Sequence, residues 1–233
     1  MEVLVPDFVP SNAGFRFPNS FPRVPVRRIG IPGVLSIPLG DASNGLCGGM
    51  AFAARDYFEA DRSPPEDRTP PGESSPLFRY IVDRLFDSFD LPLGPSRYME
   101  LMNPGLSDGD SVLAQLGIGP HGRAWRMIRE EWPKVRTDID GGHPSALGLV
   151  RVKSLNPLDL KMNHQVLAYG YQTANGSVTL RIYDPNRPGD DDQTLSLQVS
   201  DPRRPSAIRS TLPGNPVLSF FRVEYSPKRP PSP

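Results

Sequence analysis

Apolar positions recur with helical spacing in the first part of the chain. A stripe along SSPLFRYIVDRLFDSFDL predicts a helix, with Ser75 as its N-cap and Pro76 as its first residue. The segment from Cys47 has a helical face too, formed by Met50, Ala53, Ala54, Tyr57 and Phe58. Further helices are expected at 96–103, at 122–132, and from Pro133 to the stop at Gly141-Gly142.

Strand patterns follow from residue 145 onward. Segments 145–152 and 164–172 are rich in apolar, β-branched and aromatic residues, and Asn175-Gly176 then suits the positive-φ positions of a hairpin turn. Alternating or apolar segments continue at 178–184, 193–200 and 216–225. Helices early and strands late predict an α+β fold, with N-terminal helices packed against a C-terminal antiparallel β-sheet of four to six strands.

Proline, with 29 residues, indicates how the ends of the chain are organised. Residues 1–40 alternate prolines with aromatic and aliphatic residues, which predicts an extended arm that docks Phe15, Phe17 or Phe21 on the domain. A cover over a cleft is the alternative interpretation of this arm.

The remaining boundaries follow from polar, proline-rich stretches. Residues 61–76 predict a mobile loop within a folded domain at 41–226. The end of the chain, 227–233, reads SPKRPPSP from residue 226 onward and predicts a disordered tail.

Composition narrows the classes of partner. Lys+Arg and Asp+Glu both number 26, so charge gives no case for nucleic acid or an anionic membrane as a partner. No apolar run reaches the length of a membrane span, and the N-terminal sequence lacks the pattern of a secretory signal. A single cysteine cannot form an internal disulfide. We expect a cytoplasmic protein, with export of a free-thiol protein as the alternative.

That cysteine, Cys47, stands among glycines where the expected helix begins. Unpaired N–H groups and the helix dipole favour a thiolate there. Gly45, Gly48 and Gly49 are expected to leave open space through which a substrate backbone could approach the sulfur. The alternative is that Cys47 is a small buried apolar residue.

A base and an orienting acceptor can be found by counting through the hairpin. His164 opens one strand and Asp184 follows its partner, and each stands about ten residues from Asn175-Gly176. The two side chains should therefore share one end of the sheet. His121 and His143 lie in turn-like contexts and are expected to be solvated.

The order of these residues resembles that of papain-like cysteine peptidases, closest to the branch of bacteriocin-leader-processing peptidases. NGLCGGMAFA, IDGGHPSALGLV and NHQVLAYGYQTANGSVTLRIYDPN carry the resemblance, over about 45–60 and 120–190. It implies a papain-like fold, a peptide or amide substrate and no cofactor. It also implies that Cys47 is the nucleophile, His164 the general base and then acid, and Asp184 the group that orients the imidazole.

One position departs from the family pattern. The family usually has a glutamine shortly before the cysteine, as a donor to the oxyanion, whereas this chain has Asp41. Ser43, Asn44 or the backbone N–H of Cys47 would have to serve, and loss of one such donor costs about 10²–10³ in rate. The expected function is a thiol hydrolase or acyltransferase. A catalytically silent scaffold that acts as a binding protein is the alternative.

Three other site chemistries have weaker patterns. Cys47, His164 and Asp184 are zinc-ligand types, but no CxxC or HxxxH spacing accompanies them, so no metal is expected. GLCGGM lacks the GK[ST] of a phosphate loop. The acidic run Asp190-Asp191-Asp192 is interpreted as a solvated loop instead of a calcium site.

Overall fold

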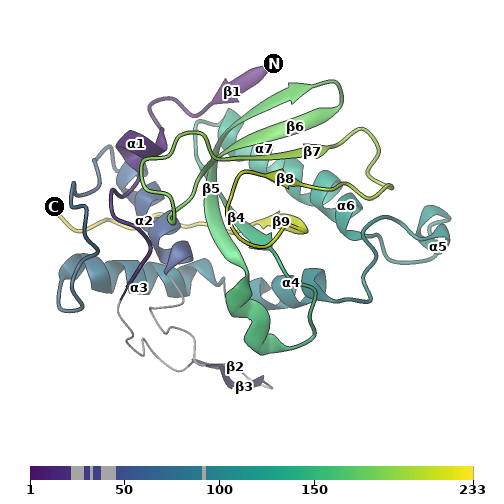
Figure 1. The fold of residues 1–233 in the computed structure, drawn as a ribbon, viewed down its shortest axis with the longest axis horizontal. Coiled ribbons are helices and arrows are strands. Elements are labelled where there is room, and N and C mark those ends of the chain that lie inside the picture. Colours follow the sequence, from purple (N-terminus) through teal and green to yellow (C-terminus); the bar gives the residue numbers. More distant parts are fainter. Residues whose placement is uncertain (22–28, 32–33, 38–45, 91–92, 233) are drawn as a thin grey trace.

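The computed structural model describes residues 1–21, 29–31, 34–37, 46–90 and 93–232. Helices pack around a curled antiparallel sheet, so the expected α+β class is confirmed (Figure 1). The N-terminal helices lie toward one end of the sheet, and the chain returns to them at its C-terminus (Figure 1).

In the described part of the chain the main sheet contains seven strands. Six follow the order β8-β7-β6-β5-β4-β9, and β1 pairs with the part of β5 that extends beyond β4. Every pairing is antiparallel. The bounds are Glu2–Leu4 (β1), Ser145–Val150 (β4), His164–Ala174 (β5), Ser177–Tyr183 (β6), Thr194–Gln198 (β7), Arg209–Ser210 (β8) and Ser219–Arg222 (β9). Because of the two short strands β1 and β8, the sheet has more strands than the expected four to six. The strands β2 (Ile29–Ile31) and β3 (Val34–Ile37) pair separately.

The β5–β6 hairpin turns where the sequence predicts it. Asn175 and Gly176 both have positive φ, 49° and 73°, and Ala174 pairs with Ser177 across the turn. Two consecutive positive-φ residues are the geometry for which Asn-Gly is selected. The register shifts once, between Ala168 and Gly170.

A helix occurs in each region where the sequence predicts one, although the bounds differ from the predicted ones. They are Pro10–Ala13 (α1), Cys47–Glu59 (α2), Pro76–Ser88 (α3), Leu93–Met102 (α4), Val112–Gln115 (α5), Arg123–Trp125 (α6), Arg126–Glu131 (η2, a π-helix), Trp132–Asp140 (α7) and Pro157–Met162 (η3, a 3₁₀-helix). Ser75 caps α3 as predicted, and its hydroxyl accepts from the Phe78 N–H at 3.0 Å.

One continuous helical run replaces two expected helices between residues 123 and 140. Its hydrogen bonding changes to π geometry over η2, which ends two residues before Pro133. Proline lacks the N–H that would continue the i→i−4 ladder, so a change in hydrogen-bond pattern at this point has a local cause.

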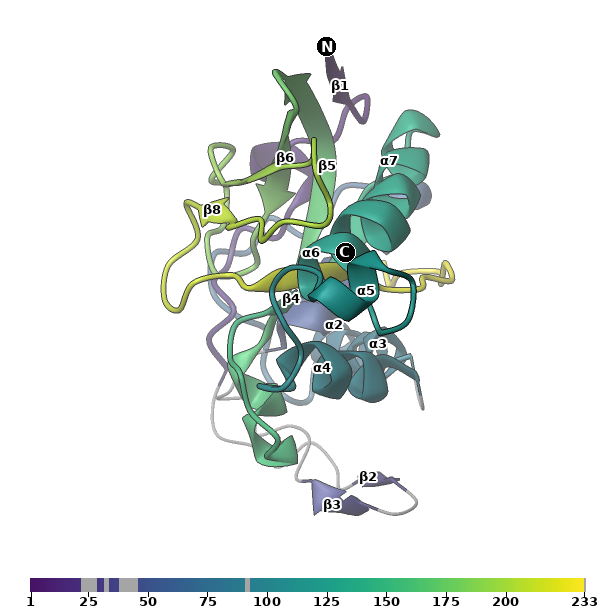
Figure 2. The same cartoon turned by 90° about the vertical axis from the view of Figure 1, so that its right-hand side faces the viewer.

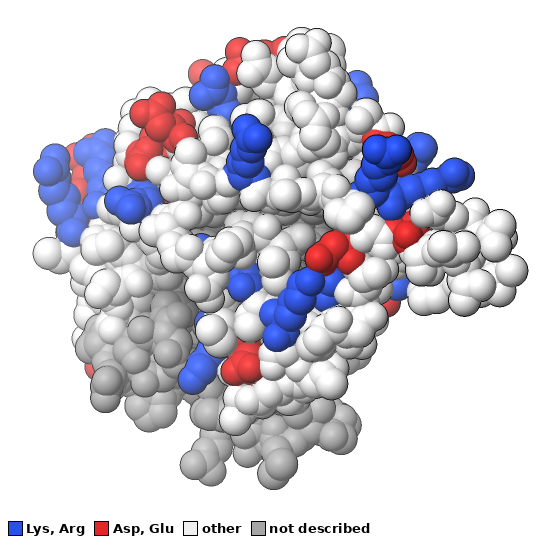
Figure 3. All heavy atoms as spheres, turned by 45° about the vertical axis from the view of Figure 1, so that its right-hand side comes forward, with Lys and Arg blue, Asp and Glu red and all other residues white. Residues whose placement is uncertain are grey.

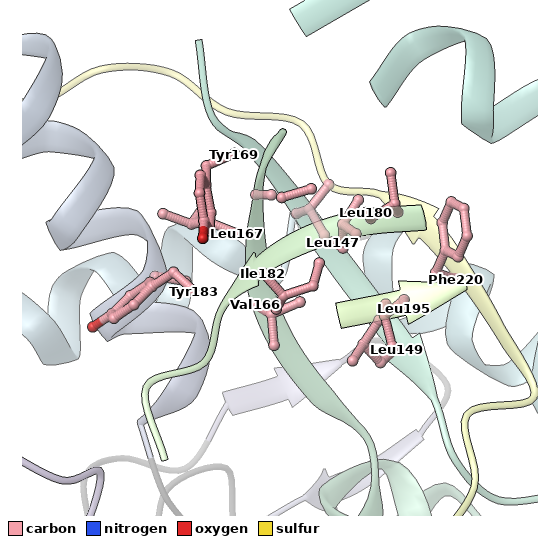
Figure 4. Packing of buried hydrophobic residues seen from close by; sticks show 14 of the residues in the cluster. Leu147, Leu149, Val166, Leu167, Tyr169, Leu180, Ile182, Tyr183, Leu195 and Phe220 are labelled. Carbon is pink, nitrogen blue, oxygen red and sulfur yellow. The ribbon is translucent and has the colours of Figure 1, made fainter. Parts of the chain in front are cut away.

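Helices cover one face of the sheet. The sheet also curls, so that apolar side chains on its other face are buried. In Figure 2, α7 lies against the sheet, while α2, α3 and α4 lie together below it. All six residues of β4 are buried in consequence. Figure 4 shows the packed apolar side chains of these strands, among them Leu149, Val166, Ile182 and Leu195.

The N-terminal arm is part of this core. Phe15, Phe17 and Phe21 are each at most 5% exposed, which confirms the expected docking. The Phe15 ring lies 6.0 Å from that of Tyr57 in α2, and β1 of the same arm joins the sheet. Residues 1–21 of the arm therefore pack as part of the core, while the boundary expected at residue 40 lies outside the described residues.

The C-terminal segment differs from the expected disordered tail. The Lys228 N–H donates to Asp56 at 2.9 Å, the Tyr57 hydroxyl donates to the Pro231 carbonyl at 3.0 Å, and Arg62 donates to the Pro230 carbonyl at 3.0 Å. An extended proline-rich backbone leaves its carbonyl groups free, so side chains of the helical layer can bind it.

Charge and helix length bear on the expected partners. Every helix in the described part of the chain is too short or too polar to cross a membrane. On the face in Figure 3, basic and acidic side chains are interspersed. The absence of a nucleic-acid partner stays a prediction.

Candidate active site

Cys47 is the first residue of α2, with Leu46 as its N-cap. The side chain is half-buried, and it is the free cysteine of the chain. The N-terminal turn of a helix presents unpaired N–H groups and the positive end of the dipole, which favour a thiolate at this position.

The glycines after Cys47 have a different role from the expected one. A Cβ added at Gly48 would lie 1.9 Å from Gln165 Oε1, and one at Gly49 would lie 2.0 Å from the Ile81 carbonyl oxygen. These glycines let α2 approach β5 and α3 closely, so they do not provide the expected open space around the sulfur. Gly45 lies outside the described residues.

This packing predicts a stability effect at Gly49. We expect Gly49→Ala to lower the free energy of unfolding by about 1–3 kcal/mol, because the new methyl group overlaps backbone atoms that cannot rotate away. Chemical denaturation measures the change. Gly72→Ala is the matched control, since nothing lies within 4 Å of a Cβ at Gly72. Equal midpoints for the two variants would contradict the packing role.

His164 and Asp184 meet at one end of the sheet, as the counting predicts. His164 Nε2 lies 2.7 Å from Asp184 Oδ1, and both side chains are buried, with 6% and 1% exposed. Cys47 and His164 lie near enough for each side chain to shift the pKa of the other. Because Nε2 is engaged with the carboxylate, Nδ1 is the ring nitrogen left for the thiol. The three residues thus form one chain of contacts from sulfur to carboxylate.

The charges in this chain of contacts shift each pKa toward an ion pair. Burial raises the pKa of the Cys47 thiol, but the His164 charge, its hydrogen bond and the Gln165 and Gly48 N–H groups outweigh burial and lower it. Burial lowers the pKa of His164, but the Cys47 thiolate and Asp184 outweigh this and raise it to about 10. Asp184 has a lowered pKa because its partner His164 outweighs the effect of burial. A thiolate–imidazolium pair is the form these shifts favour near neutral pH.

Two residues that the sequence analysis did not select complete the surroundings. The Asn186 backbone N–H donates to Asp184 Oδ1 at 2.9 Å, and its side-chain Nδ2 lies 3.3 Å from His164 Nε2. The Gln165 side chain donates to the Ser88 carbonyl at 3.1 Å, which ties β5 to the end of α3. The Asp-Pro-Asn sequence after β6 is a turn signal that could have indicated Asn186. Gln165 has no comparable signal.

The other two histidines are held elsewhere. His121 stacks on Trp125 at 3.7 Å and lies 2.8 Å from Asp110, while His143 is exposed and lies 3.0 Å from Glu59. His164 is therefore the histidine that the structure places at Cys47.

The expectations about the oxyanion donors, a metal site and the acidic run remain. Some of them concern residues that the structure does not describe. Ser43, Asn44 and Asp41, which bear on the oxyanion, lie outside the described residues. Among those described, no group of three or more His, Cys, Asp or Glu side chains could hold a metal ion. In the acidic run, Asp191 accepts from the backbone and hydroxyl of Ser11, so its carboxylate holds the N-terminal arm.

Comparison with known proteins found no relative of this chain. No family model matches the chain, and no curated protein or solved structure was found to be similar to it. Functional inference therefore depends on the arrangement of the side chains.

Proposed function

We propose that this protein is a thiol hydrolase or acyltransferase of the cysteine-peptidase kind, acting on a peptide or amide through Cys47, His164 and Asp184. One observation carries the proposal: His164 joins a half-buried cysteine at a helix N-terminus to a buried carboxylate 2.7 Å away. An adjacent base that is itself oriented by a third group is the arrangement that activates a nucleophile.

The fold supports a papain-like assignment within this proposal. The cysteine begins a helix that packs on an antiparallel sheet, and the histidine and aspartate come from one end of adjacent strands in that sheet. Their chain order, Cys then His then Asp, is the order in the resemblance described above. The fold assignment and the chemistry stand together as one proposal.

The chemistry follows from the ion pair. The Cys47 thiolate attacks the substrate carbonyl carbon, and the carbonyl electrons move to oxygen. The protonated His164 then donates its Nδ1 proton to the leaving amine as the C–N bond breaks, which leaves a thioester on Cys47. Water, or another amine or hydroxyl, then attacks the thioester carbonyl while His164 takes its proton, and the C–S bond breaks to release the product and restore the Cys47 thiolate. Asp184 holds the ring through Nε2 and stabilises its charge.

The lowered thiol pKa gives the first test. We expect Cys47 to react with iodoacetamide with a midpoint below the ordinary thiol pKa of about 8.5. The sign follows because a lowered pKa keeps the reactive thiolate at more acidic pH. Mass spectrometry of the modified peptide measures the rate, and Cys47→Ala gives the background. A midpoint at or above about 8.5 would contradict the proposal.

Acyl transfer needs a separate measurement. We expect an activated peptide ester to form a covalent thioester on the wild-type chain, visible as a mass increase that hydroxylamine removes, and absent in Cys47→Ala. A low-pKa thiol that forms no acyl-enzyme would favour the silent scaffold instead. Asp41, six residues before Cys47, is the feature of the sequence that keeps this alternative open.

A further inference from the structure

Asn19, in the N-terminal arm, bridges two elements of the candidate site. Its Oδ1 accepts from the backbone N–H of Leu46, directly before Cys47, at 2.6 Å. Its Nδ2 donates to Asn186 Oδ1 at 3.0 Å, and its own backbone N–H donates to the Pro185 carbonyl at 3.1 Å. One side chain thus joins the N-cap of α2 to the turn that follows Asp184.

The direction of each hydrogen bond follows from the Leu46 N–H, which can only donate. Asn19 must therefore present its oxygen to Leu46 and its amide nitrogen to Asn186. Asn186 in turn presents its oxygen to Asn19, so its Nδ2 lies on the side of His164, 3.3 Å from Nε2; this is a close contact instead of a hydrogen bond, because Nε2 donates its own proton to Asp184. The amide orientations on both asparagines are thus set by a backbone donor at the start of the helix that carries the nucleophile.

The arm fixes Asn19 from both sides. Phe17 and Phe21, two residues before and after it, are buried at 0% and 5% exposure. The Phe21 ring lies 5.8 Å from Phe78 in α3, and Phe17 lies 5.0 Å from Phe15. The backbone at Asn19 is consequently held by the core while its side chain reaches the site.

We propose that Asn19 is a positioning residue, which keeps the Cys47 sulfur in register with the His164–Asp184 pair; this rests on the function proposed above. Cys47 and Asp184 belong to different layers, and a thiolate–imidazolium contact is lost when the groups separate by about an ångström. An amide suits the position because it accepts from an N–H and donates to a carbonyl oxygen at once. An aspartate keeps only the acceptor, and an alanine keeps neither.

The test measures the pH profile of Cys47 alkylation in Asn19 variants. We expect Asn19→Ala to move the midpoint upward and to slow the reaction at pH 6 by about tenfold, the lower end of the effect of losing a residue that orients a ligand or base. Asn19→Asp, which fills the same volume, should also raise the midpoint, because it loses the donor to Asn186 and adds negative charge near the thiolate. Asn12→Ala is the matched control, since Asn12 is an exposed asparagine in the same arm.

A double variant separates positioning from general support of the fold. Asn186→Ala should reproduce part of the shift, and Asn19→Ala with Asn186→Ala should shift the midpoint by less than the sum, because both act through one chain of hydrogen bonds. All profiles are recorded well below each variant's melting temperature. A strap that only stabilises the fold would lower that temperature and leave the alkylation midpoint of the folded protein unchanged.

The outcomes distinguish this inference from the proposed function. A low wild-type midpoint that Asn19→Ala and Asn19→Asp both leave unchanged overturns the role of Asn19 alone. A wild-type midpoint at or above about 8.5 overturns the ion pair, and with it both proposals. A low wild-type midpoint that rises in both Asn19 variants, and not in Asn12→Ala, supports the positioning role whether or not a substrate has been found.

Discussion

His164→Ala is expected to slow the alkylation of Cys47 at pH 6 by roughly tenfold or more. Without the imidazolium, burial is left to raise the thiol pKa, so the thiolate fraction at pH 6 falls to less than about one in a hundred. A thiolate of higher pKa is intrinsically more nucleophilic, and its reactivity rises about threefold per unit of pKa. This partly offsets the decrease in alkylation rate. The net effect remains large because the fraction falls faster than the nucleophilicity rises.

The other histidines provide the controls for this result. His121→Ala and His143→Ala should leave the alkylation profile unchanged, because these rings lie against Trp125 and Glu59. Acyl-enzyme formation should be lost in His164→Ala and retained in both controls. A His164→Ala profile that matches the wild type would exclude His164 as the partner of the thiolate.

Phe15→Ala is expected to lower the free energy of unfolding by about 3–5 kcal/mol. The ring is fully buried between Phe17 and Tyr57, so its removal leaves a cavity between the arm and α2. For a chain of this length the loss corresponds to a fall in melting temperature of roughly 10 °C. Calorimetry or a thermal scan followed by circular dichroism measures it.

An exposed apolar residue gives the comparison. Leu116→Ala removes a side chain that is 67% exposed and should change stability by less than about 0.5 kcal/mol. If Phe15→Ala were as mild as Leu116→Ala, the arm would be bound too weakly to hold Asn19 in place. The positioning role proposed for Asn19 would then lose its mechanical basis.

Local features of the fold could be predicted because their causes lie within a few residues. Ser75 and Pro76 begin α3 through a cap and a fixed φ, and Asn175-Gly176 forms the hairpin turn because those residues tolerate positive φ. The contact between His164 and Asp184 follows from that turn, since antiparallel pairing brings the two ends of a hairpin together.

Expectations about the surroundings of Cys47 were less accurate because spacing does not report what packs against a residue. The sequence places Cys47 at a helix start, and the structure agrees. It does not indicate that Gly48 is needed because Gln165 lies against α2, or that Pro231 in the C-terminal segment binds Tyr57. The composition of that segment is typical of a disordered tail. Its backbone carbonyl groups, which have no partner within the segment, accept hydrogen bonds from side chains of the helices.

The sequence by itself therefore determined the α+β class, the helix that begins at Cys47 and the shared end of the hairpin. The tertiary structure decided which segments complete the site. Asn19 bonds to Leu46 across 27 positions and to Asn186 across 167, and Tyr57 bonds to Pro231 across 174. Such contacts depend on how the arm, the helices and the sheet pack together. The free energy of that packing comes from the whole core, so no local sequence pattern indicates it.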